Sequence, residues 1–429
     1  MRTQGLMTLA LLAMGVFQTS VQAQEISLQE EVAALRQRAD ALEGQRQLLF
    51  EKEIDSYLNR TETERTAQGA DAWQQVSIRA NIVSVFLATV GAKPGDTHAL
   101  HGVARLEFDF TVTDNLDLFV YTEADSGGSF PSGFGAIAGT AGATLSGLHD
   151  GVGVDGTVSI APGSIRVREA GVTWAAPIGS QTLFVMLGKL DPRDHYAQNA
   201  FAQDPRTQFL NNLFDDPPAL NWPTNAAGVN IFGVNTWMSF GGDSQFRVDL
   251  GYFNTPGQWF NRGVFFAQFL WTTKLLQRET NLRIYGMLDT VTVAETGAFG
   301  VSWDWYALDK IGVFARATVK DNQSPNAGET NQVESDWQVG AVFFGLIPGR
   351  PDDSLGVAVG YIKGPVRAMI PGGAPENHEG VIEVYYRYMH EGGKIQITPV
   401  AQFIVDPAAG TFTDPDLLVL LGIRIFVPF

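Results

Sequence analysis

The end of the chain alternates in character, residue by residue, and this restricts the fold more than any other feature. One face of the segment carries, counting back from the end, Phe429, Val427, Ile425, Ile423, Leu421, Val419 and Leu417. The other face carries Phe426, Arg424 and Gly422. Successive side chains of a β-strand point to opposite faces, so the segment predicts a strand with one fully apolar face. A soluble sheet that happens to end in an apolar strand is the alternative.

The same alternation recurs along residues 75–429. In Gly102–Val112, apolar side chains share one face and charged or hydroxyl side chains share the other. Segments near 246–252, 282–289 and 311–320 repeat the pattern. They run about ten residues, the length with which a tilted strand crosses a bilayer. A soluble sandwich also alternates, but strands of this length favour a membrane barrel.

The connections between these segments alternate between short and long. Short turns are predicted at Thr113–Asn115, Gly241–Ser244 and Gln277–Thr280. Long loops rich in glycine and proline are predicted at Ser126–Pro162, Asp191–Gly228, Lys320–Ser335 and Lys363–His378. At about 22 residues per strand and connection, residues 75–429 predict an all-β transmembrane barrel of about 16 antiparallel strands.

The first 74 residues differ in kind. Arg2, the apolar run Leu6–Phe17 and the small residues Val21 and Ala23 predict a signal peptide over 1–23, with an uncleaved anchor helix as the alternative. Residues 24–65 place Leu28, Leu35, Leu42 and Leu49 seven apart, which predicts a short periplasmic α-helix. It forms either a coiled coil between subunits or a single amphipathic helix lying on its own barrel. Residues 66–74 are predicted to be a linker.

Composition argues against several other functions. The net charge of −17 is unlike that of nucleic-acid binders. The chain has no cysteine, its six histidines are scattered, and no catalytic serine motif is present, so we expect no metal, no cofactor and no enzyme. The run Gly151–Gly156 matches G-x-G-x-x-G, but no helical pattern follows it, so nucleotide binding is not expected.

Several motifs resemble one family. Gly345–Tyr361 reads GLIPGRPDDSLGVAVGY, and Gly188–Asn212 reads GKLDPRDHYAQNAFAQDPRTQFLNN. Near the end, Glu383–Arg387 and Gly422–Arg424 follow in order, and the earlier run Ile311–Arg316 also fits. Together these motifs resemble the carbohydrate-selective porin (OprB) family over roughly residues 75–429. The helical segment 24–65 departs from the simplest members of that family.

The resemblance implies a 16-stranded outer-membrane porin for passive diffusion of small hydrophilic solutes, with carbohydrates preferred. It also implies that the barrel-assembly machinery reads Phe429. A less selective porin for ions and small solutes, or a barrel that anchors an adhesin or an enzyme, are the alternatives. The expected partners are outer-membrane lipid, sugars or other small solutes, and further copies of the chain through residues 24–65. The N-terminal segment is expected in the periplasm.

The strand pattern also predicts which charged side chains face the lumen. A sugar porin needs charged groups that exchange hydrogen bonds with hydroxyls at a narrow place. The predicted pore-lining residues are Arg105, Glu107, Asp109, Asp117, Glu123, Arg247, Asp249, Arg283, Arg316, Glu383, Arg387 and Arg424. Many of them could instead pair with one another and stiffen the wall.

The loop 191–228 is the candidate for a constriction inside the barrel. Its aromatic side chains would be poorly placed on an exposed loop tip, and folding into the lumen would cover them. Packing against the base of the loop, or against a neighbouring subunit, would cover them as well. The predicted constriction residues are Asp194, Tyr196, Asn199, Phe201, Gln208, Asn211 and Trp222.

Overall fold

The computed structural model describes residues 76–90, 98–127, 165–220, 232–241, 244–254, 263–290, 296–321, 333–363, 378–390, 392–406 and 417–429. The signal peptide, the helical segment 24–65 and the linker 66–74 therefore lie outside the described residues. Among the described residues, no helix is both long enough and apolar enough to cross a membrane.

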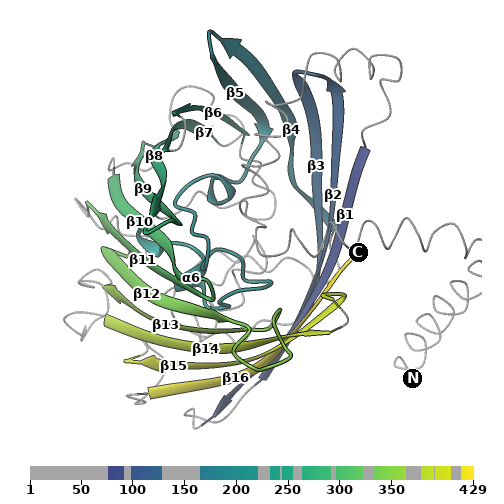
Figure 1. Cartoon of the computed structure of the whole chain (residues 1–429), viewed down its shortest axis with the longest axis vertical. Helices are drawn as coiled ribbons and strands as arrows, with labels where there is room; N and C mark the ends of the chain where they lie inside the picture. Colours follow the sequence, from purple (N-terminus) through teal and green to yellow (C-terminus); the bar gives the residue numbers. More distant parts are fainter. Residues whose placement is uncertain are drawn as a thin grey trace, which may run out of the picture. The chain divides into compact units, whose positions relative to one another are not determined.

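Sixteen antiparallel strands form a closed barrel in which each strand pairs with its neighbours in sequence and β1 pairs with β16 (Figure 1). The predicted fold class and strand number are confirmed. The strands are β1 (Val76–Val90), β2 (His98–Thr113), β3 (Leu116–Gly127), β4 (Ile165–Ile178), β5 (Gln181–Lys189), β6 (Phe232–Gly241), β7 (Gln245–Asn254), β8 (Val264–Leu275), β9 (Arg278–Asp289), β10 (Thr296–Leu308), β11 (Ile311–Lys320), β12 (Ser335–Phe344), β13 (Ser354–Lys363), β14 (His378–His390), β15 (Ile395–Val405) and β16 (Leu417–Pro428). Closure leaves no unpaired strand edge, which lipid would not tolerate.

The last strand has the two faces that its sequence predicts. Leu421, Ile423 and Ile425 are 47%, 46% and 40% exposed, whereas Arg424 and Phe426 are buried. Phe429 extends the pairing to β1, because its backbone N–H donates to the Ala80 carbonyl at 2.8 Å. Sequence alternation therefore separates a lipid-facing surface from a lumen-facing surface.

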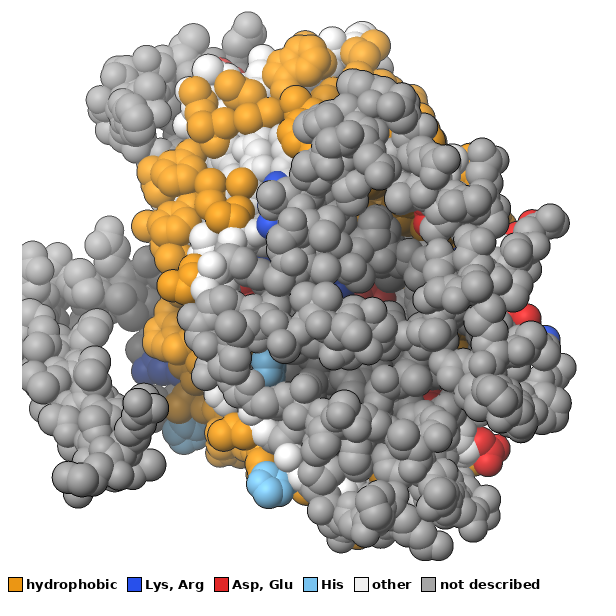
Figure 2. Space-filling model, turned by 180° about the vertical axis from the view of Figure 1, so that it is seen from behind, with side chains coloured by type: hydrophobic (Ala, Val, Ile, Leu, Met, Phe, Trp, Pro, Cys, Tyr) orange, Lys and Arg blue, Asp and Glu red, His pale blue; other side chains and the backbone are white. Residues whose placement is uncertain are grey.

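The outer surface is apolar along the other strands as well. Figure 2 shows hydrophobic side chains gathered over the part of the barrel wall that is visible from that side. Leu250, Phe265 and Phe299 belong to this surface and are about half exposed. Such a continuous apolar band suits the hydrocarbon core of a bilayer.

One predicted turn is misplaced. The β8–β9 turn consists of Leu276 and Gln277, and Arg278–Thr280 already belong to β9. Both turn residues have positive φ, 53° and 65°. A two-residue hairpin turn demands this left-handed conformation, which glycine and asparagine adopt most readily. Leucine and glutamine give no such signal, so the sequence pattern could not locate this turn.

Candidate functional site

The chain between β5 and β6 folds into the barrel rather than away from it. Residues 190–220, called the lumen loop below, lie inside the ring of strands (Figure 1). The loop contains two short 3₁₀ helices, η2 (Pro192–Asp194) and η3 (Pro218–Leu220), and one turn of α-helix, α6 (Asn212–Asp215). Its Tyr196, Phe201, Phe209 and Phe214 side chains are at most 2% exposed, as expected for aromatic groups that need cover.

Local hydrogen bonds shape this loop. The Asp191 carboxylate accepts from the Arg193 backbone N–H at 3.1 Å and so caps η2. The Asn211 side chain accepts from the Leu213 backbone N–H at 3.0 Å and caps α6. Both are residue types that favour the start of a helix, because a short side-chain acceptor satisfies an otherwise unpaired N–H.

The first half of the loop is fastened to strands β6, β8 and β10 by neutral polar groups. The Tyr196 hydroxyl donates to Asn235 at 2.6 Å, and the Ala197 N–H donates to Gln268 at 2.9 Å. The Asn199 amide donates to the Ser302 hydroxyl at 3.1 Å. These wall residues point inward from three different strands, and each meets a loop group that would otherwise be buried without a partner.

Buried charges fasten the second half. Arg316 of β11 donates to the carbonyls of Ala202 at 2.6 Å and Asp215 at 3.1 Å. Arg424 of β16 donates to the carbonyls of Pro205 at 2.6 Å and Gln208 at 2.7 Å. Each guanidinium therefore joins two separate points of the loop backbone to one strand.

Glu383 of β14 binds N–H groups of the loop backbone, whereas the two arginines bind its carbonyls. Its two carboxylate oxygens accept from the backbone N–H groups of Leu210 at 2.6 Å and Asn211 at 2.8 Å. Further along the loop, Asp336 of β12 accepts from the Ala219 N–H at 2.9 Å. Removing one such group would leave buried loop N–H donors unpaired, at a cost of about 1–3 kcal/mol each.

Glycines in the wall make room for the loop. An added Cβ at Gly312 of β11 would overlap the Phe201 ring, and one at Gly251 of β7 would overlap the Tyr196 hydroxyl. An added Cβ at Gly360 of β13 would lie 2.6 Å from Leu213. The loop therefore packs directly on the backbone of the wall at these three points.

Other lumen charges pair within the wall. Arg105 and Glu123 form a buried ion pair at 2.6 Å. Arg247 contacts Asp249 at 2.7 Å, and Arg283 contacts Asp304 at 2.5 Å. These contacts match the alternative interpretation of lumen charges as wall-stiffening pairs.

A third group of charges stays partly exposed. We call this group the charged window: Arg79 of β1, Glu107 and Asp109 of β2, and Arg168 of β4 on the wall, and Arg193, Asp194, Asp204 and Arg206 on the loop. Arg168 contacts Asp194 at 2.7 Å, and Arg206 lies 3.9 Å from Glu107. Tyr121 of β3 lies beside them and donates its hydroxyl to Asp109 at 2.9 Å.

The predicted pore-lining residues thus divide by location. Glu107 and Asp109 lie in the charged window, whereas Arg105, Glu123, Arg247, Asp249 and Arg283 pair within the wall. Arg316, Glu383 and Arg424 face inward as predicted from the strand pattern, and the lumen loop covers them to 2% exposure or less. Asp117 and Arg387 lie on β3 and β14, outside these groups.

The predicted constriction residues differ in their positions and contacts. Asp194 reaches the charged window, while Tyr196, Asn199 and Asn211 are buried on the side of the loop that faces the wall. Gln208 braces the loop by accepting from the Gln203 N–H at 2.8 Å, and Phe201 packs on Gly312. Trp222 and residues 221–228 lie outside the described residues.

Sequence reasoning misses several members of the site. Arg79, Arg168, Arg193 and Arg206 are absent from the predicted set, and so are the uncharged fasteners Gln268 and Ser302. Arg79 follows the inward phase of β1, so a stricter use of alternation could have found it. Arg168 stands at a register shift of β4 beside the inward-facing Glu169, where alternation fails. Arg206 follows Asp204 within a loop, where no periodicity applies.

Three carboxylates of the lumen loop have unusual pKa values. Burial raises the pKa of Asp216 to about 7, although Arg193 at 3.8 Å opposes this. Burial and the adjacent Asp216 also raise the pKa of Asp215. For Asp204, burial acts upward, but the Arg206 guanidinium outweighs it and holds the pKa below its usual range.

His195, near the start of the lumen loop, lies beside the carboxylate of Glu169. Burial acts to lower the pKa of His195, but its contact with Glu169 outweighs burial, and the pKa is raised. The two side chains lie 3.6 Å apart.

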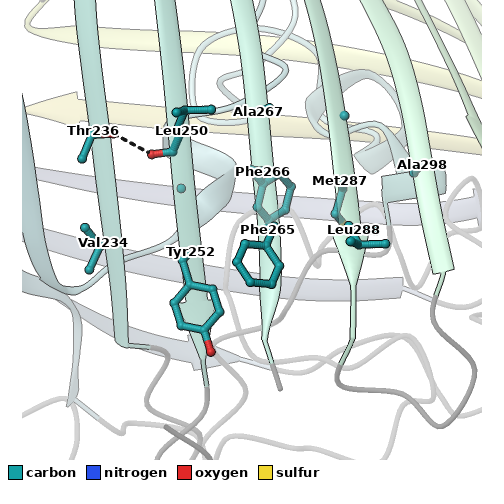
Figure 3. Close-up of a pocket in the computed structure, with 12 residues that line it drawn as sticks. Val234, Thr236, Leu250, Tyr252, Phe265, Phe266, Ala267, Met287, Leu288 and Ala298 are labelled. Atoms are coloured by element: carbon teal, nitrogen blue, oxygen red, sulfur yellow. Dashed lines mark hydrogen bonds between the residues drawn. The ribbon is translucent and has the colours of Figure 1, made fainter. Parts of the chain in front are cut away.

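A hollow of about 600 Å³ lies over strands β6–β10 (Figure 3). Leu250, Phe265 and Leu288 border it with their exposed, outward-facing side chains, and Ala267 and Gly286 leave the space between them. This hollow therefore opens on the lipid-facing side of the wall and is no part of a route through the lumen.

Replacing Gly312 by alanine tests whether the loop packs directly on the wall. The added methyl group would displace the Phe201 ring, so we expect the midpoint temperature of barrel unfolding to fall, by the equivalent of about 1–3 kcal/mol. Heat-modifiable migration on gels measures that midpoint. Gly286→Ala is the matched control, because the nearest atom to its added Cβ is 3.5 Å away. Phe201→Ala should cancel most of the Gly312→Ala effect, and a full effect in that background would contradict this packing.

The loop carboxylates predict a pH dependence. Asp216 binds a proton in the folded state up to about pH 7, but in the unfolded chain only up to about pH 4. The contribution of Asp216 to the free energy of unfolding should therefore fall as the pH rises from about 4 to 7, and it should stay constant above pH 7. Asp215 and His195 act in the same direction.

Unfolding midpoints between pH 5 and pH 8 measure this slope. Asp216→Asn should reduce the slope, because Asp215 and His195 still contribute to it. Asp204→Asn serves as the control, because a lowered pKa makes its contribution constant over that range. An unchanged slope in Asp216→Asn would refute the assignment.

Known proteins give two independent comparisons. Residues 288–429 match the family model described as carbohydrate-selective porin, OprB family. The fold is similar to the high-pH structure of OprB from Pseudomonas putida, with a TM-score of 0.63 and 15% identity over 86% of this chain and 96% of that chain. A search of curated proteins finds no match.

Two further structures support the fold. The low-pH structure of Pseudomonas putida OprB has a TM-score of 0.52 and 14% identity, covering 82% of this chain and 92% of that one. A loop-deletion mutant of OmpT, an outer membrane protein of Vibrio cholerae, has a TM-score of 0.50 and 12% identity, covering 84% and 100%. Identities this low speak for the fold alone. The chain therefore has the closed barrel fold of these outer-membrane proteins, and its residues 288–429 are similar to the OprB family of carbohydrate-selective porins.

Proposed function

We propose that this porin passes small neutral hydrophilic solutes and that carbohydrates are its preferred class. The route runs between the lumen loop and the β1–β4 wall. The loop is fastened to strands β6–β16 by groups that are almost fully buried, whereas the charges that face β1–β4 remain partly exposed. On that side a solute would meet charged groups that are partly exposed to water.

The balance of charge in the window carries this proposal. Four carboxylates, Glu107, Asp109, Asp194 and Asp204, stand against four guanidinium groups, Arg79, Arg168, Arg193 and Arg206. The chain as a whole carries −17, yet these eight partly exposed groups include both signs in equal number, so a passing solute would meet donors and acceptors alike. A neutral polyol can exchange hydrogen bonds with both kinds of group as it passes.

A less selective porin for ions and small solutes is the second candidate. Its support is the 53% exposure of the Arg79 side chain, which leaves one charged group of the window largely in contact with water. No described constellation supports a barrel that anchors an enzyme or an adhesin.

Planar-bilayer recordings separate the two candidates. We expect glucose to reduce single-channel KCl current in a saturable way, because a sugar in the window displaces ions. Asp109→Asn should weaken this block roughly three- to ten-fold, the worth of one hydrogen bond. The control is glycerol at matched viscosity. A glucose effect no larger than that of glycerol would remove the sugar preference and leave the less selective porin.

Further proposals concern the chain ends. We propose that residues 1–23 are removed on export, that 24–65 lie in the periplasm, and that the assembly machinery reads Phe429. The Phe429 side chain supports the last of these, because the residue is 73% exposed while its backbone is held by Ala80.

Oligomerisation through residues 24–65 is the remaining proposal. Cross-linking of the full chain should give multimers, whereas a version that lacks 24–65 should give fewer of them. The barrel itself is the internal control, since both versions should show heat-modifiable migration. Equal cross-linking of the two versions would exclude the heptad segment as the oligomer contact.

A further inference from the structure

One contact of the lumen loop differs from its other fastenings. Arg206 lies 3.9 Å from Glu107 of β2, and the two side chains are 26% and 20% exposed. Elsewhere, Arg316, Glu383 and Arg424 hold loop backbone groups directly and are buried. The Arg206–Glu107 contact joins two side chains, is longer than a hydrogen bond and is open to water.

The two residues sit within a chain of alternating charges. Arg206 is held on the loop by Asp204 at 2.7 Å, which fixes where its guanidinium points. Glu107 is held on the wall by Arg79 at 3.2 Å, and Arg79 reaches on to Asp109 at 2.8 Å. Both ends of the long contact are therefore positioned by shorter ones, and the contact itself is the weak link.

The position of the Arg206–Glu107 contact in the barrel determines what its opening would change. Arg168 and Asp194 join the loop to β4 at 2.7 Å, and Arg206 and Glu107 approach each other on the β2 side. Strand β3, with Tyr121, lies between those two strands. The two contacts therefore flank the charged window, and the one at β2 is the easier to open.

We propose that Arg206 and Glu107 are the specificity-determining pair of this channel, and that their separation sets both the width of the window and its balance between anions and cations. This rests on the porin fold and not on the proposed preference for sugars. Ion conductance alone measures it, so a failure of the sugar proposal leaves it standing.

The expected effects have opposite signs. Glu107→Gln leaves Arg206 without its wall partner, so the channel should shift toward anions. Arg206→Gln should shift it toward cations. A unit charge about 5 Å from a passing ion changes the local ion concentration roughly three-fold in a water-like dielectric, so permeability ratios should move by about that factor.

Reversal potentials in a KCl gradient and single-channel conductance measure both effects. In the double variant Glu107→Gln/Arg206→Gln, conductance should rise while selectivity returns near that of the unmodified channel. The shifts should shrink as salt is raised from 0.1 to about 1 M, since the screening length falls from about 10 Å to about 3 Å.

The matched control is an ion pair away from the lumen loop. Arg278 and Asp309 lie 2.7 Å apart at the β8–β9 and β10–β11 turns, and Asp309 is 89% exposed. Arg278→Gln should leave selectivity unchanged. Heat-modifiable migration of every variant shows that the barrel has formed. If folded Glu107→Gln and Arg206→Gln channels keep the conductance and selectivity of the unmodified channel, the proposal is overturned.

Discussion

The structure depends on how a polar loop is accommodated inside a barrel. Residues 190–220 bring backbone N–H and C=O groups into a space where many of them lose contact with water, and each of these groups needs a partner. The wall supplies partners as buried charges on the inward face of single strands. Arg316 and Arg424 take carbonyls, and Glu383 takes N–H groups. Hydrogen bonds to charged groups are among the stronger ones in proteins, so a few residues hold a long segment.

Because contacts with the loop and within the wall bury them, many charged groups of the lumen have little access to a solute. A charge can sit inside a barrel if it is paired, and the described charges find partners in three ways. Arg105 and Glu123 pair across neighbouring strands, Arg424 pairs with loop carbonyls, and Arg206 pairs across the window. In the last kind both partners stay partly exposed, with Arg206 at 26% and Glu107 at 20%.

The alternation in the sequence predicts the barrel because the surrounding lipid requires apolar side chains on the outer face of each strand. Every spanning strand must turn apolar side chains outward, and this rule acts on each residue separately, so the sequence alone assigns Ile423 and Ile425 to the outer face. Strand number follows from length. The β8–β9 turn escapes prediction because Leu276 and Gln277 adopt a conformation for which their side chains give no signal.

The candidate site is less predictable, for a physical reason. Alternation tells which residues point into the lumen, but it cannot tell which of these a loop will cover. Glu107 and Glu383 look alike in the strand pattern, yet one borders the window and the other lies under the loop. What separates them is a contact between residues far apart in sequence, such as Leu210 with Glu383.

Arg424 shows what this means for function. It lies in a strand whose outer face meets lipid and whose inner face is expected, from the sequence, to meet solute. Its guanidinium instead holds the carbonyls of Pro205 and Gln208, on both sides of Arg206. A buried residue of the last strand thus positions the loop residue that faces Glu107. If the Arg206–Glu107 pair sets the selectivity as proposed, the buried inner face of β16 contributes to it through the loop.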